Sequence, residues 1–204
     1  MIHLGVLAST KGTDMQAVID AIKAGTLDAR ISCVISNRPD NYALERARNH
    51  GIEAIFVNPK DFGSREEFDA EIAKELNKRN IDLVLLIGYM RILSRPFVEA
   101  FRNRAMNIHP SLLPAFAGGM DSDVHEKVIE SGVKFSGCTL HFISEDVDEG
   151  PIILQKIVNV DNNETPASLK EKVQKAEQET IIEGIRLFKE GRIVVDGKRV
   201  KLDI

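Results

Sequence analysis

The first hundred residues alternate between short apolar runs and segments with helical spacing, and this pattern constrains the fold most. Apolar runs of strand length stand at 2–8, 31–36, 54–57 and 83–87. Between them lie polar turns and segments in which apolar residues recur at helical spacing, such as Phe68, Ile72 and Leu76. Strands that alternate with helices favour a parallel sheet covered by helices on both faces. We therefore expect an α/β fold.

The second half of the chain is more mixed. Apolar runs at 137–143 and 152–160 flank an acidic turn, so we expect two antiparallel strands there. Thr165 has the residue type of an N-cap, and the pattern predicts a helix over 166–189 with proline at its first position. The Asp-Gly pair at 196–197 predicts the two-residue turn of a final hairpin.

The composition excludes several classes of function. The 204 residues are 43% hydrophobic and 28% charged, with a formal net charge of −4. Lysines and arginines are scattered, so we expect no nucleic-acid partner. No apolar run approaches the roughly 20 residues that span a bilayer, and none at the N-terminus suits a signal peptide, so we expect a cytoplasmic protein with no membrane partner. Cys33 and Cys138 lack CxxC spacing and are expected to be buried free thiols.

The stretch Ala105–Pro114, Ala-Met-Asn-Ile-His-Pro-Ser-Leu-Leu-Pro, is the best candidate for a reactive site. Alternation along a strand places Asn107 and His109 on one face, and Pro110 ends the strand there. Ligands of open α/β sheets bind at this carboxyl edge. An amide donor beside a histidine suits acyl transfer, although a polar pair that only binds a neighbouring loop fits the pattern equally well.

A third group could come from the acidic turn at 145–150, but spacing does not say which carboxylate faces inward. Ser111 could form a triad with His109, but it lacks a Gly-x-Ser-x-Gly elbow. Metal ligation is disfavoured as well, because His109, His125 and His141 lack the spacing of a metal-binding motif.

The first turn, residues 9–14, offers a phosphate site. It lacks both the GxGxxG and the Walker pattern, which disfavours dinucleotide binding. Gly12 and Thr13 nevertheless stand at the N-terminus of a predicted helix, where backbone N–H groups favour a phosphate; an ordinary N-cap is the alternative.

In the last helix, Glu177 interrupts an apolar stripe. It either lies at the edge of the stripe, which is commoner, or points into a site.

Three motifs in order resemble one known family: Gly88–Leu93, Asn107–Pro114 and Asp148–Ile153. The chain is similar over nearly its whole length to the phosphoribosylglycinamide formyltransferases, within the formyl-folate transferase and hydrolase superfamily. The resemblance implies a Rossmann-like formyltransferase fold in one domain over 1–204. It also implies a phosphate- and nucleotide-binding half, 1–100, and a catalytic and folate-binding half, 101–204.

The resemblance implies an enzyme that transfers the formyl group of 10-formyltetrahydrofolate to the amine of glycinamide ribonucleotide in de novo purine biosynthesis. The formyl folate is a co-substrate, and no metal is expected. The expected partners are these two small molecules. The protein is expected to be a monomer or a homodimer. Asn107, His109 and Asp148 would be the catalytic trio. Asn107 and His109 would meet the developing oxyanion, and Asp148 would orient His109 and help to carry the proton.

The resemblance also assigns binding residues. The residues that would hold the phosphate and ribose are Gly12, Thr13, Asp14 and Glu177. The residues that would receive the folate are Arg65, Met90, Arg91, Ile92, Leu93, Asn107, Ile143 and Val147. The chain departs from the family pattern at Thr10, where a glycine is common, at Asp14, where an asparagine is common, and over residues 116–120.

Other functions compete with this one. A 10-formyltetrahydrofolate hydrolase uses the same trio with water as acceptor, but it typically carries an extra N-terminal domain, whereas this sequence begins at the first strand. A methionyl-tRNA formyltransferase would need a C-terminal domain and a basic surface. A non-catalytic nucleotide-binding module would not need the intact trio.

Overall fold

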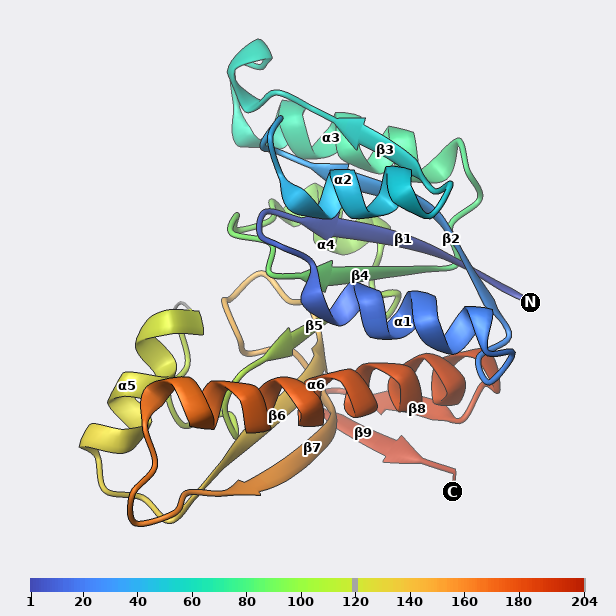
Figure 1. Cartoon of the computed structure of the whole chain (residues 1–204). Helices are drawn as coiled ribbons and strands as arrows, with labels where there is room; N and C mark the ends of the chain where they lie inside the picture. The colour runs from blue at the N-terminus through green and yellow to red at the C-terminus, as the bar shows by residue number, and fades with distance from the viewer. Residues whose placement is uncertain (119–120, 204) are drawn as a thin grey trace. The chain divides into compact units, whose positions relative to one another are not determined.

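The structure is a computed structural model that describes residues 1–118 and 121–203. Within it the chain forms two compact units. We call Met1–Asn107 the N-terminal unit and Ile108–Ile204 the C-terminal unit. The elements of each unit are labelled in Figure 1.

The N-terminal unit is built on a parallel sheet. Its strands are β1 (Ile2–Ala8), β2 (Ala29–Ser36), β3 (Glu53–Phe56), β4 (Leu83–Ile87) and β5 (Ala105–His109). They are hydrogen-bonded in the order β3-β2-β1-β4-β5, and every neighbouring pair is parallel. The chain thus starts in the middle of the sheet and winds outward in both directions, and ligands bind at the carboxyl ends of the strands in sheets of this kind.

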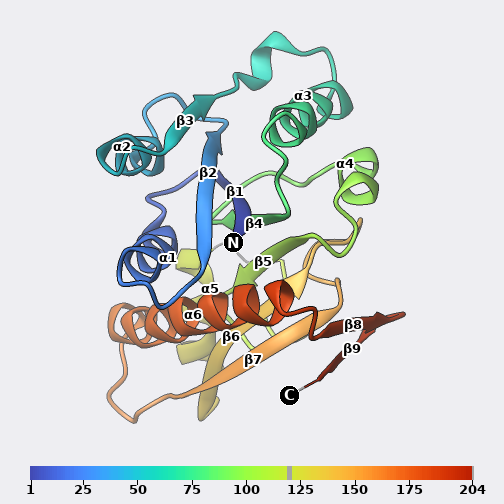
Figure 2. The same cartoon turned by 90° about the vertical axis from the view of Figure 1, so that its right-hand side faces the viewer.

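Helices cover both faces of this parallel sheet. The helices are α1 (Thr13–Lys23), α2 (Tyr42–Asn49), α3 (Arg65–Asn77) and α4 (Arg95–Ala100), with a 3-10 turn, η1 (Pro59–Asp61). Figure 2 shows α1 and α2 on one side of β1, β2 and β4, and α3 and α4 on the other. Two covered faces explain why β4 is buried at every position and reads as one apolar run.

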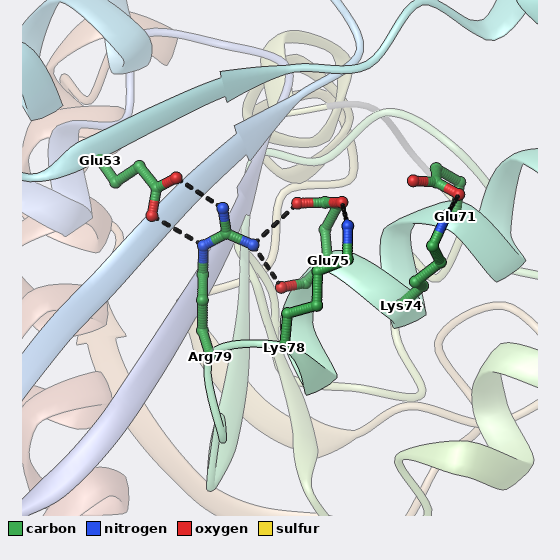
Figure 3. Close-up of polar contacts among 6 residues, drawn as sticks. All are labelled: Glu53, Glu71, Lys74, Glu75, Lys78 and Arg79. Atoms are coloured by element: carbon green, nitrogen blue, oxygen red, sulfur yellow. Dashed lines mark hydrogen bonds and ion pairs between the residues drawn. The ribbon is translucent and has the colours of Figure 1, made fainter.

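The exposed end of α3 carries a network of ion pairs (Figure 3). The guanidinium of Arg79, just after α3, donates from Nε to Glu53 of β3 at 2.7 Å and from Nη1 to Glu75 of α3 at 2.8 Å. Lys78 also pairs with Glu75, and Lys74 pairs with Glu71 at 2.8 Å. These contacts join the end of α3 to the edge strand β3.

The C-terminal unit contains an antiparallel strand pair and a long helix. Its strands are β6 (Phe135–Phe142) and β7 (Ile152–Asn159), which pair antiparallel, and the hairpin of β8 (Ile193–Asp196) and β9 (Arg199–Leu202). Its helices are α5 (Asp121–Glu130) and α6 (Pro166–Lys189). β6 follows β5 in the strand order. α6 packs on β6 and β7 and begins with a capping box between Thr165 and Ser168, as the N-cap signal predicted.

These elements confirm the predicted α/β class with a mostly parallel sheet and an antiparallel strand in the C-terminal half. The predicted bounds differ in detail, since β2 begins at Ala29 rather than at Ile31 and β6 at Phe135 rather than at Gly137. The division between the units falls inside β5, whereas we expected halves that meet at residues 100 and 101. The single domain over the whole chain stays a prediction.

The turn of the final hairpin corrects one prediction. We expected Asp196 and Gly197 to be its two central residues, but Asp196 pairs with Arg199, so the turn is Gly197-Lys198. Gly197 has φ +61°, and a type II′ turn needs glycine at its first central position.

Cys33 and Cys138 are buried free thiols, as predicted. Burial raises the pKa of each thiol to about 12, which keeps both protonated and unreactive. In the part of the chain that the structure describes, no helix is long and apolar enough to cross a membrane.

Candidate active site

A buried histidine–carboxylate pair lies in the C-terminal unit. His109, the last residue of β5, places Nδ1 3.3 Å from Oδ2 of Asp148, and the side chains are only 5% and 9% exposed. On the other side of the ring, Nε2 donates to the carbonyl oxygen of Phe116 at 3.1 Å. Both ring nitrogens therefore face hydrogen-bond acceptors, which fix the orientation of the ring.

The structure distinguishes Asp148 from the other acids of its turn. Glu145, Asp146 and Glu149 are exposed, whereas the carboxylate of Asp148 is turned inward. Its Oδ2 also accepts the backbone N–H of Gly118 at 2.8 Å. Asp148 has φ +58°, a left-handed conformation that aspartate tolerates better than most residues.

Gly150 allows this turn to close. A Cβ atom at this position would lie 1.7 Å from the carbonyl oxygen of Phe142, so no other residue fits without a shift of the backbone. The glycine of the Asp-Glu-Gly motif therefore has a steric role, because the chain must pass against the end of β6 to return along β7.

His141 is a second histidine near the same carboxylate. Its Nε2 lies 3.7 Å from Oδ1 of Asp148, and its Nδ1 donates to the carbonyl oxygen of Phe142 at 2.9 Å. Burial lowers the pKa of His141, so its ring is neutral near neutral pH with the proton on Nδ1. Of the two histidines, His109 lies closer to the carboxylate of Asp148. From the sequence we considered His141 only as a metal ligand; the alternation of β6 was the signal that could have placed it on the site's face.

The segment after His109 is held by hydrogen bonds from β6 and β7. Thr139 donates to the carbonyl oxygen of Ser111 at 2.7 Å and accepts the N–H of Leu113 at 3.0 Å. Gln155 donates to the carbonyl oxygen of Leu113 at 2.9 Å. The hydroxyl of Ser111 donates to the carbonyl oxygen of Ala115 at 2.5 Å, which disfavours the alternative of a triad with Ser111 as nucleophile. Gly119 and Met120 of the variant segment 116–120 lie outside the described residues.

The first loop of the N-terminal unit forms the start of α1. Gly12 is the N-cap of α1, with φ +64° and no side-chain cap, and Thr13 and Asp14 are the first two helical residues. A Cβ atom on Gly12 would lie 3.0 Å from that of Ala43, so glycine suits both the conformation and the space. The N–H groups of this first turn have no partner within the helix, as a phosphate site requires.

Ser9 ties this loop to the segment after β4. Its N–H donates to the carbonyl oxygen of Gly88 at 3.1 Å, and its hydroxyl accepts the N–H of Met90 at 2.9 Å. Among the expected folate residues that follow, Met90 and Ile92 are 40% and 55% exposed, whereas Leu93 is buried.

Arg91 and Arg65 lie beside α3 in the same unit. The guanidinium carbon of Arg91 is 4.5 Å from the ring centroid of Phe68, and Arg65, the first residue of α3, pairs with Glu66 at 3.5 Å. Both arginines act electrostatically on the buried Asp69. The structure thus brings these two expected folate residues to one place, around a carboxylate that the sequence did not single out.

The remaining expected residues are distributed over both units. Asn107 is half-buried on β5 and its backbone pairs with Leu86. Glu177 is buried on α6, and whether it lies at the edge of the apolar stripe or points into a site stays a prediction. Ile143 and Val147 follow β6, and Val147 is 48% exposed.

Among the described residues, no group of three or more His, Cys, Asp or Glu could hold a metal ion.

The fold and the buried pair define an α/β protein with a histidine–carboxylate site at the carboxyl end of the parallel strand β5. Residues 3–185 match the formyl transferase family model, and the chain belongs to this family.

Named relatives agree with this assignment. The chain is 37% identical over 204 residues to a phosphoribosylglycinamide formyltransferase of Haemophilus influenzae, covering 100% of this chain and 94% of that protein. It is 42% identical over 191 residues to a human trifunctional purine biosynthetic protein adenosine-3, covering 94% of this chain but only 19% of that protein. The chain therefore spans about a fifth of the human relative.

Solved structures show the same fold. A glycinamide ribonucleotide transformylase from Symbiobacterium toebii matches with a TM-score of 0.94 and 46% identity, over 99% of this chain and 94% of that chain. A formyltetrahydrofolate deformylase from Pseudomonas syringae matches with a TM-score of 0.88 and 27% identity, over 98% of this chain and 65% of that chain.

Proposed function

We propose that this chain is a phosphoribosylglycinamide formyltransferase, which moves the formyl group of 10-formyltetrahydrofolate to the amine of glycinamide ribonucleotide. The observation that carries the proposal is the buried pair formed by His109 of the Asn-Ile-His-Pro motif, at the end of β5, and Asp148 of the turn between β6 and β7. The full-length relative from Haemophilus influenzae bears this name. The proposal includes a cytoplasmic enzyme that acts in purine biosynthesis as a monomer or homodimer.

The chemistry is acyl transfer. The amine nitrogen attacks the formyl carbon, and the carbonyl electron pair moves to the oxygen to give a tetrahedral oxyanion. We assign the amide of Asn107 and the Nε2–H of His109 as its hydrogen-bond donors, with the oxyanion replacing the carbonyl oxygen of Phe116 as the acceptor from Nε2. When the oxyanion collapses, the bond from the formyl carbon to N10 of the folate breaks, and the proton lost by the amine goes to N10.

Asp148 supports this step through His109. A carboxylate at Nδ1 fixes the orientation of the ring and stabilises its positive charge, as in other histidine–carboxylate pairs. The ring of His141, on the other side of Asp148, is neutral, so the negative charge of Asp148 acts mainly on His109.

The substrate phosphate is assigned to the N-terminus of α1, with Gly12 and Thr13 offering backbone N–H groups. Asp14 is buried at the second helical position, where a carboxylate interacts favourably with the helix dipole but repels a phosphate. We therefore assign Asp14 to the support of the helix and Glu177 to the ribose hydroxyls.

In the N-terminal unit we assign the folate to Met90 and Ile92, whose exposed apolar side chains suit a flat ring, and to Leu93 and Asn107. In the C-terminal unit we assign it to Ile143 and to the exposed Val147. The side chain of Arg91 packs on Phe68, so Arg91 offers its backbone groups to the ligand. Arg65 at the exposed start of α3 suits an acidic tail.

Dependence on the acceptor tests the proposal. Purified protein should consume 10-formyltetrahydrofolate only when glycinamide ribonucleotide is present, measured by the absorbance of the folate. The same rate without the ribonucleotide would instead identify a deformylase like that of Pseudomonas syringae. No turnover under either condition would contradict the proposed activity and support the hypothesis of a non-catalytic binding module.

A further inference from the structure

The carboxylate of Asp69 is the most deeply buried acidic group of the N-terminal unit. The residue is 0% exposed on α3, and its Oδ2 accepts the backbone N–H of Ser94 at 2.6 Å. Oδ1 has no hydrogen-bond partner among the described residues. Burying a carboxylate costs free energy unless charges and hydrogen bonds compensate it, so its presence here calls for a physical reason.

Two arginines supply part of that compensation. Burial raises the pKa of Asp69, while the hydrogen bond from Ser94 and the positive charges of Arg91 and Arg65 oppose the rise. Arg91 is held in turn by the ring of Phe68, the neighbour of Asp69 on α3. Residues of α3 therefore bind the segment 91–94 at two points, through its arginine side chain and through the backbone of Ser94.

The segment Gly88–Ser94 is consequently held at both ends by hydrogen bonds, part-buried at Met90 and buried at Ser94. Ser9 binds the carbonyl oxygen of Gly88 and the N–H of Met90 at one end, and Asp69 binds Ser94 at the other. Between these contacts the chain presents the exposed apolar side chains of Met90 and Ile92. Hydrogen bonds at both ends restrict the conformation of this irregular segment.

We propose that Asp69 is a positioning residue for the formyl donor, holding the segment Gly88–Ser94 in the conformation that receives the folate. The inference rests on the proposed function, because that function assigns the folate to this segment. Asp69 itself touches no substrate. Its effect passes through the backbone of Ser94 and the guanidinium of Arg91.

The test compares Asp69→Ala and Asp69→Asn with a matched control. Asp82→Asn is suitable, because the carboxylate of Asp82 also accepts a backbone N–H, that of His3 at 2.8 Å, but at an exposed position. We expect Asp69→Ala to raise KM for 10-formyltetrahydrofolate about ten- to hundredfold, with kcat and KM for the ribonucleotide within about twofold of wild type. Asp69→Asn should fall in between, because its amide oxygen still accepts from Ser94 but carries no charge. Asp82→Asn should leave all three parameters unchanged.

A merely structural role predicts a different pattern. Asp69→Ala would then lower the midpoint of thermal unfolding and the active fraction, with KM for the donor unchanged, and this result would overturn the proposal. If Asp69→Ala does not fold, the donor KM of Asp69→Asn decides by the same criterion.

Calorimetric titration with tetrahydrofolate separates this inference from the proposed function, because binding needs no turnover. Weaker binding to Asp69→Asn than to wild type supports the positioning role even if wild type transfers no formyl group. Equal binding by both overturns that role, and the absence of binding to wild type overturns both proposals.

Discussion

Two polar clusters of this molecule differ in where their charges lie. The network around Arg79 reaches the protein surface: the side chains of Glu53 and Lys78 are each 52% exposed, and those of Arg79 and Glu75 are 19% and 16% exposed. The pair of His109 and Asp148 is almost entirely shielded from water. Both clusters bring a carboxylate close to a side-chain nitrogen, at 2.7 Å between Glu53 and Arg79 and at 3.3 Å between Asp148 and His109. The first cluster is more open to water than the second, so water screens its interactions more strongly.

The difference indicates what each cluster does. Exposed ion pairs typically contribute about 0–1 kcal/mol each, so the Arg79 network gives modest stability to the contact of α3 with β3. A buried pair gains little net stability because desolvation opposes the attraction. The conformation of such a pair is fixed, however, and its interaction with a developing charge is strong, as catalysis requires. We therefore expect the first cluster to affect stability and the second to affect activity.

The largest effect should follow from Asp148→Asn or His109→Asn. Either change removes the histidine–carboxylate pair at the site, and we expect kcat to fall about 100- to 10,000-fold, measured with saturating donor and acceptor. The midpoint of thermal unfolding of Asp148→Asn should change by only a few degrees, whereas that of His109→Asn should fall further, because this variant leaves a buried carboxylate without its partner. Glu149→Gln is the matched control, because this neighbouring carboxylate is exposed and paired with Lys198 at 3.3 Å, and it should retain wild-type kcat.

Near-normal turnover of either site variant would contradict the assignment of this pair to catalysis. Equal losses in Asp148→Asn and Glu149→Gln would also contradict it, because the activity would then depend on the charge of the turn rather than on the inward carboxylate.

A smaller effect, on stability alone, should follow from Arg79→Ala. The variant loses the contacts to Glu53 and Glu75, so we expect its free energy of unfolding to be about 1 kcal/mol lower than that of wild type. Its kcat should be unchanged. Denaturant unfolding at low salt measures the difference. A loss of activity in this variant would show that the two clusters are coupled and would break the comparison.

The pH dependence of Arg79→Ala sharpens this prediction. The hydrogen bond from Arg79 lowers the pKa of Glu53, and those from Lys78 and Arg79 lower that of Glu75. Because these pKa values are lower in the folded state, the contribution is present above the ordinary pKa of glutamate and is lost as the pH falls through the lowered values. The stability difference between wild type and Arg79→Ala should therefore shrink in acid.

Much of the fold could be predicted from the sequence because its signals are local. The run Leu83–Ile87 is a buried strand with the expected bounds, and Thr165 begins the long helix as its N-cap. The turn of the last hairpin was misplaced by one residue, because an Asp-Gly pair does not itself specify whether glycine is the first or the second central residue.

The site could be predicted only in part, because its partners are distant in the sequence. Alternation in β5 identified His109, but no local rule distinguishes Asp148 from the other three acids of its turn. That choice depends on the left-handed conformation of Asp148 and on the close passage of Gly150 against Phe142. Asp69 was missed for a similar reason, since an acidic residue at helical spacing beside Phe68 also fits a solvated face.

The most direct test of the proposed transfer follows the formyl carbon itself. Wild-type protein is incubated with 10-formyltetrahydrofolate labelled with ¹³C in the formyl group and with glycinamide ribonucleotide, and the products are identified by mass spectrometry. We expect the label on the amine of the ribonucleotide, in an amount equal to the tetrahydrofolate formed. Label recovered as free formate, with the ribonucleotide unmodified, would contradict the proposed transfer.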